Sequence, residues 1–107
     1  MSGLDDRRKG YEADFQHREE LAFRIRARRN RLIGLWAANR LGVNRGPAAE
    51  AYARRIVAMD VDVPGDDGIV RKLSSDFAAK GVDTAEAEIR AELAHAAEEA
   101  RGQFGER

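Results

Sequence analysis

The chain has 107 residues and no net charge, and this length suffices for one small domain with a thin core. It contains no cysteine, which excludes disulfides and thiolate metal sites. No apolar run approaches the roughly 18–20 residues of a membrane span. The opening MSGLDDRRKG also lacks the apolar segment of a secretory signal, so we expect a cytoplasmic protein without membrane insertion.

Residues 1–20 favour a helix but offer little apolar surface with which to pack it. Tyr11 and Phe15 are four residues apart and would share one helix face, and Leu4 lies seven residues before Tyr11. A stripe this narrow does not hold a helix in a core. Such a segment frays when alone and becomes ordered when a partner offers a groove. We therefore divide the chain into an N-terminal arm, residues 1–20, and a helical bundle, residues 21–107.

The segment Arg24–Leu41 predicts a long helix that continues from the arm into the bundle. Its first half is rich in arginine, and its second half is the most apolar stretch of the chain. Ile25, Leu32 and Trp36 fall on one helix face, which we expect to enter the core. Gly42 is the expected end of this helix.

Shorter helices are expected after this one. Pro47 suits the first turn of a second helix, which should end before Pro64. A third helix should run from about Asp66 to Gly81. The apolar residues of this third helix that should face the core, at helical spacing, are Val70, Leu73 and Phe77. Those of the second helix are Ala49, Tyr52, Ile56 and Met59.

A fourth helix begins at an acidic capping box formed by Asp83 and Glu86. Its stripe is Ile89, Leu93, Ala96, Ala100 and Phe104. Four helices joined by short loops predict an all-α fold: an antiparallel four-helix bundle with a mobile N-terminal arm continuous with the first helix. The side chains expected to anchor the bundle are Ile25, Leu32, Ile33, Trp36, Tyr52, Ile56, Leu73, Phe77, Ile89 and Leu93.

Metal sites find little support in the sequence. The acidic loop that starts at Asp60 has Pro64 and Arg71 at positions where a calcium-binding loop needs ligands. We interpret it as a solvated acidic turn in which Asp66 caps a helix. His17 and His95 have no neighbouring ligands at metal spacing and are expected on the surface.

Catalysis finds no support either. Ser74 and Ser75 lie on a helix without a nearby base, and no phosphate-binding loop is present. We therefore expect neither an enzyme nor a bound metal or cofactor.

Charge is divided unevenly along the chain. Residues 1–45 carry eleven Lys or Arg and six Asp or Glu, a net charge of +5, and residues 46–107 carry −5. Either neighbouring helix faces complement each other within the bundle, or the basic half faces an acidic partner. The run Arg24–Arg31 leaves open a second class of function, a helical interaction or nucleic-acid-binding bundle. Glu19 and Glu20 beside it speak against nucleic acid, which we do not expect as a partner.

The segment Ala27–Ala38, ARRNRLIGLWAA, resembles the signature of a known family, the ATPase inhibitor subunit zeta of alpha-proteobacterial F-type ATP synthases. The resemblance extends over almost the whole chain. The further matching positions are Asp5–Arg7, Tyr11–Glu12, Phe15, Phe23, Ala51–Ala53, Pro64–Asp66, Arg71–Lys72 and Gly81–Asp83.

This resemblance implies a four-helix bundle whose N-terminal arm is the inhibitory element. In the family the arm is mobile when free and becomes helical on entering a catalytic alpha/beta interface of the synthase, near the gamma stalk, where it stops ATP hydrolysis. The implied partner is therefore the catalytic sector with its alpha, beta and gamma subunits. The protein would be a monomer when free, and in the cytoplasm it would lie peripheral to the inner membrane through the synthase. The candidate arm residues are Leu4, Asp5, Asp6, Arg7, Arg8, Tyr11, Glu12 and Phe15.

The chain departs from the family pattern at a few positions. Asp14 stands where the family usually has Lys, and Arg18 often replaces an acid, although the two keep the spacing of a helical ion pair. Arg26 stands where a small or acidic residue is common. These departures leave the fold prediction unchanged. They leave open whether the protein inhibits strongly or mainly assembles with the synthase.

Overall fold

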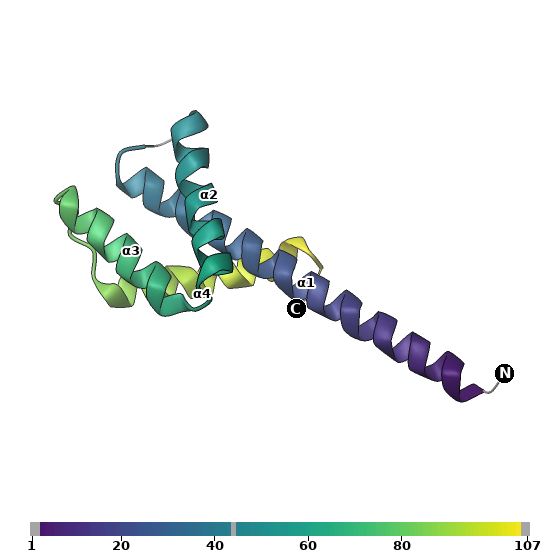
Figure 1. Ribbon diagram of the computed structural model, residues 1–107. Coiled ribbons are helices and arrows are strands. Elements are labelled where there is room, and N and C mark those ends of the chain that lie inside the picture. The colour runs from purple at the N-terminus through teal and green to yellow at the C-terminus, as the bar shows by residue number, and fades with distance from the viewer. Residues whose placement is uncertain (1–2, 44, 106–107) are drawn as a thin grey trace.

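The computed structural model of the protein describes the backbone of residues 3–43 and 45–105, and their side chains from residue 10 onward. The described chain forms four α-helices and no strand, which confirms the predicted all-α class. The helices are α1 (Gly3–Arg40), α2 (Gly46–Asp62), α3 (Asp66–Ala79) and α4 (Glu86–Gln103) (Figure 1).

α1 is a single uninterrupted helix of 38 residues, which corresponds to a length of about 57 Å. Its second half lies among the other helices, and its first half projects from them (Figure 1). The projection explains the elongated shape of the molecule, which measures 66 × 26 × 25 Å.

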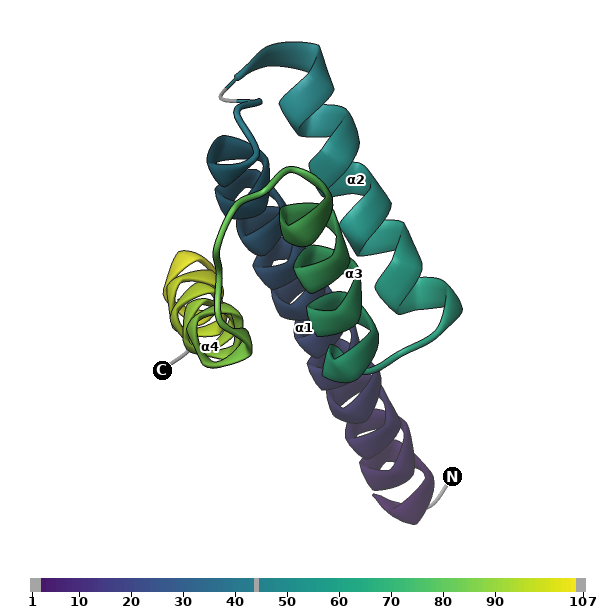
Figure 2. The ribbon, with the colours of Figure 1, turned by 90° about the vertical axis from the view of Figure 1, so that its left-hand side faces the viewer.

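α2 and α4 flank the second half of α1, and α3 lies between α2 and α4 (Figure 2). α1 packs mainly against α2 and α4, and α3 packs against both of these helices. The buried apolar side chains come from all four helices. They are Ile33, Ala37, Ala38, Ala49, Tyr52, Ala53, Ile56, Ile69, Val70, Leu73, Phe77, Ile89, Leu93, Ala96 and Ala100.

The face that α1 turns to the core differs in part from the predicted face, because Ile33 is the one predicted anchor on α1 that is fully buried. Ile25 and Leu32 are only half-buried, and Trp36 packs from the edge of the core against Phe77, with ring centroids 5.7 Å apart. The fully buried side of α1 instead consists mostly of smaller side chains, namely Asn30, Ile33, Ala37 and Ala38, together with Gly34.

Gly34 lets α2 approach α1 closely. A Cβ atom added to Gly34 would lie 2.7 Å from the Cα atom of Ala53, a separation that side chains essentially never show. The position therefore needs glycine for packing, although glycine is otherwise unfavourable inside a helix.

Two helices end as their glycines predict. Gly42 has φ 90° and Gly81 has φ 70°, a left-handed conformation that glycine adopts without strain. The N–H of Val43 then donates to the carbonyl of Ala38 at 2.8 Å, and the N–H of Val82 donates to that of Phe77 at 2.8 Å. Both are the closing bonds of Schellman motifs, which satisfy otherwise free carbonyls at a helix end.

α3 begins at Asp66 as predicted, but the predicted caps of α3 and α4 are wrong. The residues at the cap positions of α3 and α4 are Gly65 and Ala85, and neither helix has a side-chain cap hydrogen bond. Asp66 therefore does not cap α3, and Asp83 and Glu86 do not form a capping box. The carboxylate of Asp66 has stronger partners, because it faces two arginine side chains of α1.

Candidate functional site

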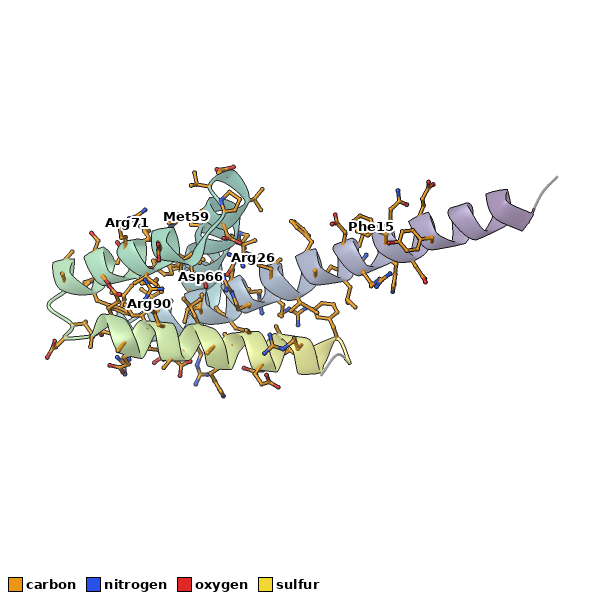
Figure 3. All side chains as sticks on the ribbon, turned by 90° about the horizontal axis from the view of Figure 1, so that it is seen from below. Phe15, Arg26, Met59, Asp66, Arg71 and Arg90 are labelled. Carbon is orange, nitrogen blue, oxygen red and sulfur yellow. The ribbon has the colours of Figure 1, made fainter. Side chains whose placement is uncertain are left out.

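The first half of α1 carries two aromatic side chains that contact no other helix. Every described side chain from residue 10 to residue 20 is exposed. Tyr11 is 68% exposed and Phe15 is 52% exposed. Figure 3 shows Phe15 on the projecting helix, well away from the bundle. The aromatic residues of the arm are thus available to a partner.

Glu12 is exposed on the same segment. The other candidate arm residues, Leu4 and Asp5–Arg8, lie in α1, but their side chains are outside the described part of the structure. Their proposed roles remain predictions.

The exposed apolar surface of the arm follows one side of α1 toward the bundle. Tyr11, Phe15 and Ala22 are separated by four and seven residues, so they fall on one helix face. Phe23, which is 60% exposed, borders this face together with Arg18 and Glu19. We call the surface formed by Tyr11, Phe15, Ala22 and Phe23 the arm stripe.

At the base of the arm, an almost fully buried carboxylate fastens α1 to α2. Asp60, in the last turn of α2, is 6% exposed. Arg26 of α1 donates to both of its oxygens, from Nε to Oδ2 at 2.5 Å and from Nη2 to Oδ1 at 3.0 Å. Asn30 donates to Oδ2 at 2.9 Å, and the backbone N–H of Gly65 donates to Oδ1 at 3.2 Å. All four lone-pair directions of this carboxylate thus find donors.

These donors control the charge of Asp60. The hydrogen bond from Arg26 is the main cause that lowers the pKa of Asp60 to about 2, and the Gly65 and Asn30 bonds act in the same direction against the effect of burial. The same pairing raises the pKa of Arg26. Both groups therefore remain charged at neutral pH.

A second carboxylate extends this contact to α3. Asp66 pairs with Arg26 at 3.1 Å and with Arg29 at 3.0 Å (Figure 3). Arg29 is almost buried, and its Nε donates to the amide oxygen of Asn30 at 2.9 Å. We call Arg26, Arg29, Asn30, Asp60 and Asp66 the base cluster. It ties the point where the arm leaves the bundle to both ends of the α2–α3 turn.

The base cluster corrects the interpretation of the acidic loop. Asp60 was predicted to lie in a solvated turn, and this is wrong because the carboxylate is buried among donors from α1. One signal in the sequence indicates its position: Asp60 follows Tyr52 and Ile56 at four-residue spacing, on the buried face of α2.

Among the described residues there is neither a group of metal-ligand side chains nor a helix suited to span a membrane. Residues 10–43 and 45–105 contain no group of three or more carboxylate or histidine side chains placed to hold a metal ion. His95 is 72% exposed and lies 3.8 Å from Glu92, and His17 is exposed too. Among the helices described here, none combines the length and the apolarity that crossing a bilayer requires.

Comparison with known families decides the assignment. The family model described as ATPase inhibitor subunit zeta matches residues 1–103, which is nearly the whole chain. The chain belongs to the ATPase inhibitor subunit zeta family. No individual curated protein matches it. The family description names an inhibitor subunit, and this is a regulatory rather than a catalytic class of protein.

In this zeta-family chain the arginines of the Arg24–Arg31 run do not form one basic face. Arg26 and Arg29 point into the base cluster. Arg31 pairs with Glu50 of α2 at 2.8 Å, and Arg28 donates to Gln103 at 2.6 Å. Arg24, Arg28 and Arg31 do share one side of the bundle, but Arg28 and Arg31 have partners within the chain, which speaks against nucleic-acid binding.

Proposed function

We propose that this protein inhibits ATP hydrolysis by an F-type ATP synthase, and that the N-terminal part of α1 is the inhibitory element. The helix would enter a catalytic alpha/beta interface near the gamma subunit and obstruct the rotation that hydrolysis drives. The observation that carries the proposal is the arm stripe, which presents large aromatic side chains on a helix outside the bundle. Membership of an inhibitor family supplies the class of target.

The energetics favour ordering of the arm on the partner. An isolated helix shorter than about 12–15 residues is marginal in water, and the arm lacks tertiary packing over a similar length. Burial of Tyr11 and Phe15 in a groove would return roughly 1.5–3 kcal/mol for each side chain. The arm is therefore proposed to be mobile when free and to become fully helical on binding.

The base cluster suits a mechanical role in this proposal. An obstruction works only if force on the arm is resisted, and α1 runs without interruption from the arm into the core. Arg26 and Asn30 hold the start of the bundle segment against α2. The bundle would act as a stopper outside the cleft, as a non-catalytic partner of the alpha, beta and gamma subunits. The protein would thus be a free monomer or a peripheral component of the synthase on the cytoplasmic side.

Deletion of residues 1–19 tests the proposal. The core begins at Arg29 and Asn30 on α1, so the truncated chain should keep the helical content of the bundle. Inhibition of ATP hydrolysis by purified catalytic sector should disappear. Full inhibition by the truncated protein would overturn the assignment of the arm.

A double substitution isolates the arm stripe from the rest of the arm. Tyr11→Ala with Phe15→Ala should weaken inhibition at least about tenfold, because both aromatic anchors are lost. His17→Ala with Glu20→Ala, which changes two exposed residues outside the stripe, is the matched control. Equal loss in both variants would place the inhibitory contact elsewhere on the arm.

A further inference from the structure

The bundle carries a groove next to the arm that has an apolar floor and a basic rim. Its volume is about 640 Å³. The floor is formed by Phe23 and Ala27 of α1, Val57 and Ala58 of α2, and Phe104 after the end of α4. Two helices and the residue that follows α4 therefore build one concave surface, at the place where the arm joins the bundle.

The rim of this groove consists of four arginines, and no acidic side chain lines it. Arg31 is paired with Glu50, and the guanidinium of Arg28 lies 5.6 Å from the ring centroid of Phe104. Arg24 and Arg54 are exposed and form no ion pair with a described side chain, although Glu19 and Glu20 line a shallow pocket together with Arg24. At least two positive charges therefore face solvent beside an exposed apolar floor.

This combination specifies the chemistry of an occupant. An apolar floor takes the apolar face of an amphipathic helix, and unpaired arginines on the rim take carboxylates of that helix in charge-assisted hydrogen bonds. The groove is therefore a place where basic residues of the chain gather beside a surface that can bury a partner.

The position of the groove relates it to the arm. Phe23 belongs both to the arm stripe and to the groove floor. It follows Phe15 by eight residues, which is about 12 Å along the helix axis. A protein that encloses the arm as far as Phe15 therefore meets the groove directly at the mouth of its cleft.

We propose that this groove is a second docking site for the same catalytic sector, and that it receives an acidic amphipathic helix at the mouth of the cleft that takes the arm. The inference rests on the proposed function, because it assigns the groove to the same partner. In the bound state the two contacts lie on one continuous helix, so the second contact raises the affinity of the first by holding the start of the arm at the mouth of the cleft.

The test measures binding of full-length variants to purified catalytic sector at low and at high salt. Arg24→Glu with Arg54→Glu reverses the two unpaired rim charges. We expect at least about tenfold weaker binding than for the wild type at low salt, and a smaller difference at high salt, since screening weakens both charge pairs. The control, Arg45→Glu with Arg71→Glu, makes the same change of charge at exposed positions outside the groove, and its affinity should stay within about twofold of the wild type.

A substitution without change of charge tests whether the apolar floor of the groove contributes to binding. Ala58→Trp places a large side chain in the groove from an exposed position, so the bundle should keep its melting temperature while binding weakens. Unchanged binding of both groove variants would overturn the second docking site, and arm-dependent inhibition would still stand.

Two other results would also overturn the proposal, in distinguishable ways. If the wild type fails to bind the catalytic sector at all, the proposed function fails and the groove assignment fails with it. If the wild type binds a single-stranded RNA oligonucleotide, and the rim variant loses this affinity but keeps the affinity for the catalytic sector, the groove serves nucleic acid instead.

Discussion

The two halves of α1 are one continuous helix with opposite surroundings. In the half from residue 10 to residue 20, every described side chain is exposed, including Tyr11 and Phe15. In the half that enters the bundle, Ile33, Ala37 and Ala38 have no exposed surface. The backbone conformation is the same in both halves, so it does not distinguish a binding element from a structural one. The distinction lies in which side chains find partners within the chain.

The base cluster is where these halves meet, and removing its central carboxylate should have the largest effect on stability. Asp60→Ala leaves Arg26, Asn30 and the backbone N–H of Gly65 without their shared acceptor in an almost buried site. Breaking a buried ion pair costs about 3–5 kcal/mol, but Arg26 is 41% exposed, so we expect about 2–3 kcal/mol. The melting temperature should fall by about 10–20 °C.

Asp67→Ala is the control for that experiment. Asp67 lies one residue from the base cluster and pairs with Arg90 on the surface, where its side chain is 77% exposed. Its removal should change stability by less than about 0.5 kcal/mol. Equal losses in the two variants would show that Asp60 has no special role in joining the halves.

Acid should weaken the ion pair between Asp60 and Arg26 and thereby lower the stability of the protein. The pKa of Asp60 is about 2 in the folded state and 3.8 in its ordinary state, so the folded state favours the ionised carboxylate. This contribution, about 2 kcal/mol, is fully present above about pH 4 and is lost as the pH falls toward 2. Urea unfolding measured between pH 5 and pH 2 should therefore show a steeper loss of stability in the wild type than in Asp60→Asn. Parallel curves for the two proteins would contradict the ion pair.

The sequence predicted the number of helices and the exposure of Tyr11 and Phe15, but of the anchors that it predicted on α1 only Ile33 is fully buried. Helix number follows from apolar spacing and from glycines such as Gly42 and Gly81, which act locally. The buried face of α1 depends on small residues around Gly34, which give a weak apolar signal, and on a close approach of α2. Asp60 was misjudged because its main partner, Arg26, is 34 residues away in sequence. Only the packed structure brings the two together.

Gly34 offers a direct test of that close approach. In Gly34→Ala the new methyl group would meet the backbone of Ala53, and the helices would have to separate. We expect a loss of about 1–3 kcal/mol in the free energy of unfolding, as for other overpacked cores. An unchanged melting temperature would mean that α1 and α2 are less tightly joined than the structure indicates.

Gly10→Ala makes the same substitution in the other half of the same helix, and its effect on the bundle should be the smallest. An added Cβ at Gly10 meets nothing within 4 Å. The melting temperature should therefore stay unchanged, while the higher helix propensity of alanine, about 1 kcal/mol, should increase the helical circular dichroism of the free protein. A more helical free arm loses less conformational entropy when it binds the partner, so inhibition should become somewhat stronger. A lower melting temperature in Gly10→Ala would show that the arm packs on its own bundle, whereas a gain in helicity with weaker inhibition would mean that the inhibitory conformation of the arm is not a continuous helix.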